Sequence, residues 1–454
     1  MVTIACMPAR GMRRRCYFPV RFKFAAATSI ALAWTFLSVW LSQAWVDELG
    51  AVTAPLFALF AVTFIAYVPG FMNAFLVSTL LLDRRPRRRR LASYPGVTVL
   101  VAAFNEAAAI ADTIRSAAHE EYPDPLEILV LNDGSTDATV AVAEEAKRTL
   151  RALPGVSVRI IDYRVNRGKA AVLNSGLAEA THDLIVTIDG DTLLKPDALS
   201  YIVERMQSDP AGTKAVAGAV LVRNSRENLV TGVQEWDYFH GIAAVKRMQS
   251  MYHGTLVAQG AFSIYDKTAV IEAGGWPECV GEDIVLTWAL LKNGHRIGYA
   301  EDAIVFTNAP TTLKQFALQR KRWSRGLIEA IHHHEDLLFQ PRLSAMFIWW
   351  NLLFLPLDLV YSLIFIPGVL AAVFLHQFWI AGPMTLAVLP LAGLWNLVIY
   401  RIQSRMMHEQ GLKVRRNRHG LAAYLLFYAL VMQPVCVWGY WSELLGLAKK
   451  WGTK

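Results

Sequence analysis

The hydrophobic pattern along the chain changes twice. Two long apolar stretches come first, at about residues 24–45 and 52–82, and each is long enough for a helix that crosses a membrane. From about residue 95 to residue 340 the apolar runs are short and alternate with helix-like stretches. Three long apolar stretches then return, at about residues 345–375, 378–400 and 421–447. The pattern predicts a water-exposed domain between two membrane regions.

The middle region has the pattern of an α/β domain. Its short apolar runs are typical of buried strands, and Ala107–His119 and Ala138–Arg151 are typical of helices between them. Such alternation predicts βαβ units and a mainly parallel, Rossmann-like sheet. The predicted strands are Val97–Ala103, Ile128–Leu131, Val158–Ile161, Leu184–Ile188 and Ala215–Val222.

The positive charge is concentrated beside the apolar stretches. The chain of 454 residues has a net charge of +8, but 18 of its 45 Lys and Arg residues lie in three segments, residues 1–23, 84–90 and 401–418. Basic residues beside membrane spans mark the cytoplasmic side, so this distribution indicates membrane topology and argues against a nucleic-acid partner.

These two patterns together predict a multi-pass protein of the inner (plasma) membrane with its middle domain in the cytoplasm. Because Pro434 and Glu443 interrupt the stretch 421–447, the sequence leaves open whether this stretch crosses the lipid bilayer or lies in its interface. The predicted parts are a basic cytoplasmic arm at 1–23, two spans within 24–82, a basic linker at 83–94, the cytoplasmic domain at 95–340 with an interfacial helix at about 311–334, and a C-terminal membrane region at 341–454 with two to three spans.

Three groups of polar residues directly follow predicted strands. They are Asn105-Glu106, Asp133, and the pair Asp189 and Asp191 that flanks Gly190. Ligands of open α/β sheets bind outside the carboxyl ends of the strands, so these residues are candidates for one site. Two carboxylates at one strand end suit Mg²⁺ or Mn²⁺ holding a diphosphate. Each segment alone is also compatible with ordinary turn chemistry.

Two further segments carry charge at the start or along the length of predicted helices. Glu282-Asp283 follows Gly281 and opens a helix, and Gln319-Arg320-Lys321-Arg322-Trp323 lies in the predicted interfacial helix. Acidic residues are common at helix starts, and a basic helix with one aromatic residue can simply rest on a membrane surface. Each of these segments is weak evidence for a function when taken alone, and their order along the chain is more specific.

In that order, the segments resemble the processive membrane branch of glycosyltransferase family 2. This branch includes hyaluronan, chitooligosaccharide, cellulose and poly-N-acetylglucosamine synthases. Asp133, Asp189-Gly190-Asp191, Glu282-Asp283 and Gln319-x-x-Arg322-Trp323 are similar to the family's D, D-x-D, E-D and Q-x-x-R-W series. One departure is Gly281, where the family usually has Thr. The resemblance implies a GT-A-type domain inserted between N-terminal and C-terminal transmembrane helices.

The resemblance also implies roles for individual residues. Asn105, Glu106 and Asp133 would contact the uridine, Lys169 would approach the nucleotide or its diphosphate, Asp189 would face the donor, and Asp191, with Asp189, would bind the metal. Asp283, beside Glu282, would be the general base. Gly260, in the segment 257–262, would let the acceptor approach closely, and Gln319, Arg322 and Trp323 would clamp the diphosphate and the acceptor.

The implied reaction is the inverting, processive polymerisation of a UDP-sugar into a β-linked polysaccharide, coupled to export across the membrane. UDP-N-acetylglucosamine as donor and poly-β-1,6-N-acetylglucosamine as product follow from the resemblance alone. The implied partners are the growing polysaccharide and the lipid bilayer, with room for a small membrane partner subunit. Three alternatives stay open: synthesis of another β-glycan, single addition to a lipid phosphate, and a membrane scaffold with a degenerate transferase domain.

Overall fold

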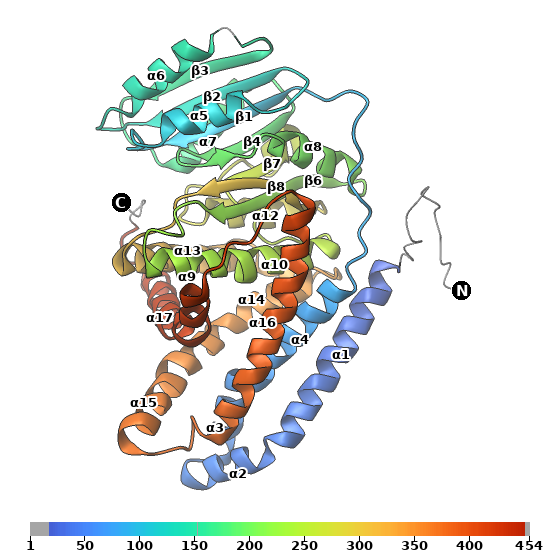
Figure 1. Ribbon diagram of the computed structural model, residues 1–454, viewed down its shortest axis with the longest axis vertical. Coiled ribbons are helices and arrows are strands. Elements are labelled where there is room, and N and C mark those ends of the chain that lie inside the picture. Colours follow the sequence, from blue (N-terminus) through green and yellow to red (C-terminus); the bar gives the residue numbers. More distant parts are fainter. Residues whose placement is uncertain (1–17, 152, 450–454) are drawn as a thin grey trace. The chain divides into compact units, whose positions relative to one another are not determined.

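The computed structural model describes residues 18–151 and 153–449, so most of the predicted basic arm lies outside the described residues. The chain forms two compact units, whose elements are drawn in Figure 1. Unit 1 contains residues 18–86, 349–416 and 422–438, and unit 2 contains residues 87–348, 417–421 and 439–449.

Unit 2 is built around one mixed sheet of eight strands in the order β3-β2-β1-β4-β7-β6-β8-β5. The first four strands in this order run parallel, β7 is antiparallel to both β4 and β6, and β8 is parallel to β6 and antiparallel to β5. The strands are β1 Val97–Ala103, β2 Leu126–Asp133, β3 Val156–Tyr163, β4 Leu184–Asp189, β5 Leu193–Leu194, β6 Thr213–Val222, β7 Phe262–Asp266 and β8 Arg296–Thr307.

Helices cover both faces of this sheet, as the alternating pattern predicts. On one face, α5 buries Ile110, Ile114 and Ala117, which share one side of the helix, against alternate residues of β1. On the other face α7 packs so closely that a side chain at Gly176 would overlap Leu131. The helical elements are α5 Ile110–Ala118, α6 Thr139–Leu150, α7 Lys169–Glu179, α8 Ala198–Ser208, α9 Leu229–Trp236, η2 Asp237–Ile242, α10 Ala243–Met251, α11 Lys267–Glu272, α12 Glu282–Lys292, α13 Leu313–His333 and η3 Glu335–Phe339.

All five predicted strands are present, and the predicted α/β fold is confirmed. The prediction of a mainly parallel sheet describes the β3-β2-β1-β4 half, whereas β7 makes the other half mixed. Strands β5, β7 and β8 were not among the predicted strands. The predicted interfacial helix at 311–334 corresponds to α13.

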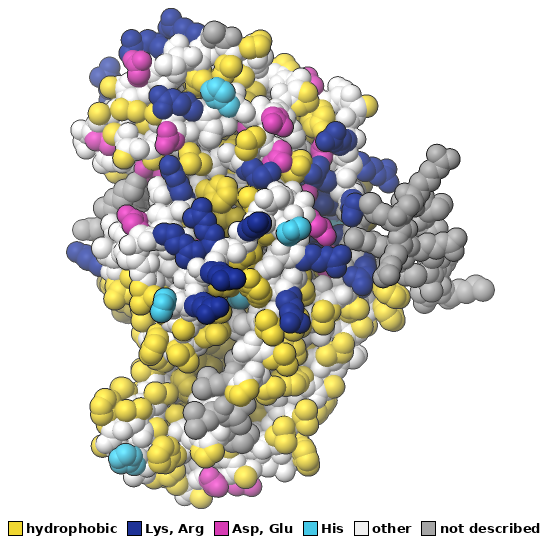
Figure 2. All heavy atoms as spheres, viewed as in Figure 1, with side chains coloured by type: hydrophobic (Ala, Val, Ile, Leu, Met, Phe, Trp, Pro, Cys, Tyr) yellow, Lys and Arg dark blue, Asp and Glu magenta, His cyan; other side chains and the backbone are white. Residues whose placement is uncertain are grey.

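Unit 1 consists of helices, and hydrophobic side chains gather over them in Figure 2. Four helical stretches among the described residues are long and apolar enough to cross a membrane: Val20–Leu41, Pro55–Leu81, Ala345–Leu375 and Arg418–Leu444. Phe36, Leu56 and Phe374 expose more than two thirds of their surfaces, which would be unfavourable in water and is favourable in lipid. The chain is therefore a membrane protein.

Two of these apolar helices contain a π-turn that ends two positions before a proline. Thr63–Tyr67 (η1) precedes Pro69, and Tyr361–Phe365 (η4) precedes Pro367. Proline has no N–H and its ring displaces the preceding carbonyls, and a π-turn accommodates this without ending the helix. The remaining elements with residues in unit 1 are α1 Val20–Leu41, α2 Gln43–Val52, α3 Pro55–Val62, α4 Val68–Leu81, α14 Ala345–Val360, α15 Ile366–Leu375, α16 Pro383–Glu409 and α17 Arg418–Leu444.

Candidate active site

Three neighbouring strand ends bring the first predicted residues together. Strand β1 lies between β2 and β4, with Ala103 opposite Asn132 and Ala102 opposite Asp189. Asp133 is the last residue of β2 and Asp189 the last residue of β4. Asn105 and Glu106 follow β1 directly, so the structure places all of these residues along one edge of the sheet.

The Asp133 carboxylate organises the loop that precedes α7. It accepts hydrogen bonds from the backbone N–H groups of Arg167, at 2.6 Å, and Gly168, at 3.0 Å. Burial raises the pKa of Asp133, and these two hydrogen bonds oppose the rise. Gly134 has a φ of +68°, and a side chain there would come within 2.5 Å of the Asn166 nitrogen, so the turn after Asp133 requires glycine.

Asn105 links the loops after β1 and β2. Its φ is +55°, a left-handed conformation that asparagine adopts more readily than most residues. Its backbone N–H donates to Ser135 Oγ at 2.9 Å, and its side-chain oxygen accepts from the Thr136 N–H at 2.9 Å. The N–H of Glu106 donates to Thr139 Oγ1 at 2.8 Å. These bonds fix the predicted nucleotide-binding edge before a ligand arrives.

Lys169 joins three motifs that are far apart in the sequence. Its Nζ lies 2.6 Å from an Asp189 oxygen and 3.5 Å from a Glu282 oxygen. Although burial favours the neutral amine, the carboxylates of Asp189 and Glu282 raise the pKa of Lys169, which is therefore charged. A side chain at Gly260 would approach this Nζ to 2.5 Å, so the segment 257–262 also reaches the cluster.

Glu282 and Asp283 open α12 but have different surroundings. Glu282 is buried, and burial raises its pKa to about 7, with the negative charge of Asp283 adding to the rise and Lys169 and Arg322 opposing it. Asp283 is partly exposed, and its carboxylate accepts from the N–H of Gly260 at 3.3 Å and from that of Ile284 at 2.8 Å. Asp283 is thus the more accessible of the two carboxylates.

The two aspartates of the D-x-D segment are held differently. Asp189 is paired with Lys169, whereas an Asp191 oxygen accepts from Thr307 Oγ1 at 3.1 Å. Gly190 lets this turn lie against the end of β1, because a side chain there would meet Glu106 Cγ at 3.0 Å. Within residues 18–151 and 153–449, no group of three His, Cys, Asp or Glu side chains forms a metal cluster. Two carboxylates completed by phosphate oxygens would suit a hard divalent ion.

Helix α13 carries the residues of the Q-x-x-R-W segment. Trp323 exposes 39% of its surface, and its ring centroid lies 6.4 Å from that of Tyr238. Arg322 is near enough to Glu282 that its positive charge opposes the rise in the pKa of that carboxyl group. The side-chain oxygen of Gln319 is buried and has no hydrogen-bond partner within the described part of the chain. Of these three side chains, Trp323 offers an open aromatic face.

The sequence analysis missed Arg320, which supports this aromatic face. Arg320 is buried, forms an ion pair of 2.8 Å with Asp237, and places its guanidinium 4.0 Å from the centre of a Trp323 ring. Gln319 and Arg322 belong to the Q-x-x-R-W motif, whereas Arg320 occupies a variable position of that motif. This cation–π contact holds the indole ring of Trp323 in place.

Tyr238 and Lys246 were also missed. Burial raises the pKa of Tyr238 to about 12, and Asp189 and Asp191 are close enough to contribute to the rise. Lys246 is buried and donates from Nζ to the Val257 carbonyl at 2.5 Å, and burial lowers its pKa to about 7. Lys246 therefore holds the segment that contains Gly260. Neither residue lies in a motif or follows a predicted strand, so no sequence signal identified them.

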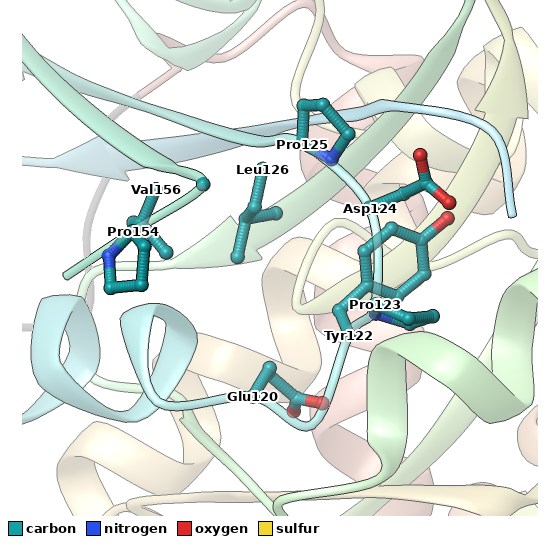
Figure 3. A pocket seen from close by; sticks show the side chains of 9 residues that line it. Glu120, Tyr122, Pro123, Asp124, Pro125, Leu126, Pro154 and Val156 are labelled. Carbon is teal, nitrogen blue, oxygen red and sulfur yellow. The ribbon is translucent and has the colours of Figure 1, made fainter.

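A separate small pocket lies at the opposite edge of the sheet, where β2 and β3 begin (Figure 3). Its lining includes Glu120, Tyr122, Pro125, Pro154 and Val156. None of the predicted site residues lines it. It lies where strands begin, whereas Asp133 and Asp189 lie where strands end. The strand-end cluster is therefore the candidate active site.

The fold and this cluster define a family 2 glycosyltransferase, and the chain belongs to that family. Residues 95–326, more than half of the chain, match the model of the glycosyltransferase like family 2. The chain is 31% identical over 274 residues to poly-beta-1,6-N-acetyl-D-glucosamine synthase of Staphylococcus aureus strain COL and 30% identical over 274 residues to that of Staphylococcus epidermidis. These matches cover 58% of this chain and 64% of each relative, so they span less than two thirds of the relatives' length.

A solved structure with the same fold is a mannosyltransferase from Pyrobaculum calidifontis, determined in complex with GDP-Man and Mn²⁺. The match has a TM-score of 0.57 and 20% sequence identity, and it covers 81% of this chain and 98% of that protein. At this identity the likeness establishes the fold alone. The expected GT-A architecture is thereby confirmed.

Proposed function

We propose that this glycosyltransferase is an inverting, processive synthase that polymerises N-acetylglucosamine from UDP-N-acetylglucosamine into a β-1,6-linked polysaccharide. The observation that carries the proposal is the junction at Lys169, where Asp189 of the D-x-D turn, Glu282 of the E-D turn and Gly260 meet around one ammonium group. The staphylococcal relatives motivate the choice of sugar and linkage.

In the proposed reaction the donor lies along the strand ends. Asp133 has accepted two backbone hydrogen bonds but keeps further lone pairs, with which it would accept the uracil N–H. Asn105 and Glu106 would border the uridine on the neighbouring loop. Lys169 carries positive charge into the site and would lie near the diphosphate, where charge develops as UDP leaves.

Asp283 would act as the general base. A sugar hydroxyl is a weak nucleophile, so a carboxylate must take its proton as it attacks the anomeric carbon of the donor. The new bond joins the acceptor oxygen to this carbon, the bond from this carbon to the phosphate oxygen breaks, and UDP leaves with the electron pair. One displacement without an enzyme nucleophile inverts the configuration, so an α-linked donor yields a β-linked product.

We further propose Asp191, with Asp189, as ligands for Mg²⁺ or Mn²⁺. The hard oxygens of the two carboxylates fit such an ion, and the hydrogen bond from the Thr307 hydroxyl orients the Asp191 carboxylate. When bound, the ion would offset negative charge on the leaving diphosphate. Arg322 would add positive charge from α13.

Trp323 supports the processive part of the proposal. Its exposed indole, held by the Arg320 guanidinium and flanked by Tyr238, would stack on a pyranose ring of the acceptor. Stacking holds a sugar without fixing the chain in one register, which suits an acceptor that must advance after each transfer. Single addition to a lipid phosphate would not need such a platform.

The apolar helix α17 also bears on the proposed topology. At its start, Asn417 donates to the Gly232 carbonyl at 2.8 Å and accepts from Trp236 Nε1 at 2.9 Å. Just before its end, Glu443 pairs with Arg325 at 2.8 Å. The helix is about 40 Å long. The partners at both of its ends nevertheless belong to the same unit, unit 2. We therefore favour the interfacial alternative for α17, because a crossing helix would place its ends on opposite sides.

Cysteine labelling in intact cells tests this topology. Cysteines in place of Glu145 on α6 and of Leu447 after α17 should both resist a membrane-impermeant thiol reagent, whereas a cysteine in place of His376, between α15 and α16, should react. Wild-type cells supply the background from the native cysteines. Labelling at Leu447 in addition to His376, with Glu145 still protected, would mean that α17 crosses the membrane, and labelling at Glu145 would overturn the cytoplasmic orientation.

Product analysis tests the reaction itself. Membranes that contain the protein are incubated with a panel of radiolabelled UDP-sugars, and the product is sized and digested with linkage-specific glycoside hydrolases. The proposal expects incorporation from UDP-N-acetylglucosamine into long chains cut by a β-1,6-specific hydrolase. Incorporation of another sugar or another linkage would correct the substrate, and a product with one added sugar would overturn processivity.

A further inference from the structure

The carboxylate of Glu329 on α13 reaches the backbone directly before the proposed base. One oxygen accepts from the Val280 N–H at 3.2 Å, and the other accepts from the Gly281 N–H at 2.8 Å. Gly281 is the residue that caps α12, whose first two residues are Glu282 and Asp283. Glu329 is 97% buried, since only 3% of its surface is exposed. A buried carboxylate therefore holds the turn at residues 280–283, called the catalytic turn below, by two hydrogen bonds.

Two glycines allow this contact. A side chain at Gly281 would lie 2.5 Å from Gly326 Cα, and a side chain at Gly326 would lie 2.8 Å from Gly281 Cα. The backbones of α13 and the turn thus touch. Gly326 and Glu329 are three residues apart and share one side of α13, so the close approach brings the carboxylate within reach of the turn. This explains Gly281, because the Thr usual at this position would collide with α13.

The segment that follows α17 completes the buried cluster. Lys449 Nζ lies 2.5 Å from the Glu329 oxygen that also binds Val280, and 2.8 Å from Glu443. Arg325, one turn before Glu329 on α13, donates to the Leu447 carbonyl at 2.7 Å and pairs with Glu443 at 2.8 Å. The charge of Glu329 is therefore balanced from the C-terminal segment and not from the catalytic turn.

We propose that Glu329 is a positioning residue for Asp283 and that Lys449 keeps it in place, so that docking of the segment 439–449 is a condition of catalysis. The inference rests on the proposed role of Asp283 as base. Glu329 touches neither the acceptor nor the donor in this scheme. It fixes the start of α12, and a turn displaced by about 1 Å would misplace the base at a cost that reaches about 100-fold in rate.

Steady-state kinetics on the full-length protein in membranes test the proposal. Glu329→Gln keeps the volume but replaces one acceptor oxygen with an NH₂ group, which cannot accept from a backbone N–H. It should lower kcat by about 10–100-fold while the Kd of UDP stays within about twofold of wild type. Lys449→Met should also lower kcat, and Lys449→Arg should restore it. Glu335→Gln, an exposed acid beyond the end of α13, is the matched control and should behave like wild type.

A double variant separates positioning from general damage. If Glu329 acts through Asp283, adding Glu329→Gln to Asp283→Asn should cause no further loss of kcat. A further loss of 10-fold or more, loss of UDP binding in Glu329→Gln, or wild-type kcat in Glu329→Gln would each overturn the proposal. So would a Lys449→Arg variant no better than Lys449→Met. Failure of the proposed function looks different, because Asp283→Asn by itself would then keep near-normal turnover.

Discussion

Replacing Glu282 with Gln tests the electrostatics of the candidate site through protein stability. Burial raises the pKa of Glu282 to about 7, from an ordinary value of 4.5. A carboxyl group whose pKa is higher in the folded state favours folding while it is protonated. That contribution is complete below the unfolded-state pKa and is lost as the pH rises through about 7. Gln resembles the protonated acid and does not titrate.

The size of the effect follows from the two pKa values. Wild type should lose roughly 2 kcal/mol of stability between about pH 5.5 and pH 8.5 through this one group, since each pKa unit corresponds to about 1.4 kcal/mol. The variant should not lose it, so the apparent Tm of Glu282→Gln relative to wild type should rise by about 2–4 °C over this range, because the unfolding entropy of a chain this large makes each kcal/mol correspond to only about 1–2 °C. Purified full-length protein in lipid nanodiscs, melted at one scan rate at each pH, provides the measurement.

The sign of the change decides the matter. If attraction to Lys169 outweighed burial, Glu282 would favour folding when charged, and the variant would become less stable than wild type as the pH rises. Such a result would refute the reasoning about this cluster. Glu335→Gln serves as the exposed control and should follow wild type at every pH.

Three other variants test the remaining roles. Asp283→Asn should lower kcat by about 10²–10⁴-fold with the Kd of UDP little changed, and near-normal turnover would place the base elsewhere. Asp191→Ala should abolish the activity that Mg²⁺ or Mn²⁺ supports, measured by titrating the ion into membranes treated with chelator, and full wild-type activity in chelator would contradict the metal assignment. Trp323→Ala should shorten the products at unchanged UDP affinity, as gel sizing would show, and full-length polymer at the normal rate would contradict the clamp.

The sequence predicted the parallel half of the sheet well because most residues of β1, β2 and β4 are apolar. Strand β1 was placed at Val97–Ala103 with the bounds found in the structure. Strand β8 was missed because Arg296, Glu301 and Asp302 interrupt its hydrophobic pattern, although the neighbouring residues are buried. Strand β7 was missed because it has only five residues and continues directly into helix α11 at Lys267.

The candidate site was predictable where chemistry coincides with a strand end or helix start. Asp133, Asp189 and Glu282 were found in this way. The meeting of Asp189 and Glu282 at Lys169 was not, because it depends on packing between distant segments. Tyr238 lies in the π-turn Asp237–Ile242, where an added residue per turn breaks the helical period on which such analysis relies. Nothing in the sequence distinguished the buried Lys246 from the exposed lysines of the surface.

The position of β7 in the sheet has a consequence for synthesis of the protein on the ribosome. Strand β4, with the apolar run Leu184–Ile188, is complete about seventy residues before its neighbour β7 has been made. At translation rates of about 5–20 residues per second, that edge stays unpaired for several seconds. Apolar strand edges are sites of aggregation, so the nascent half-sheet is the stage at which a chaperone would protect this chain. Slow codons between the two strands should therefore lower the yield of folded protein.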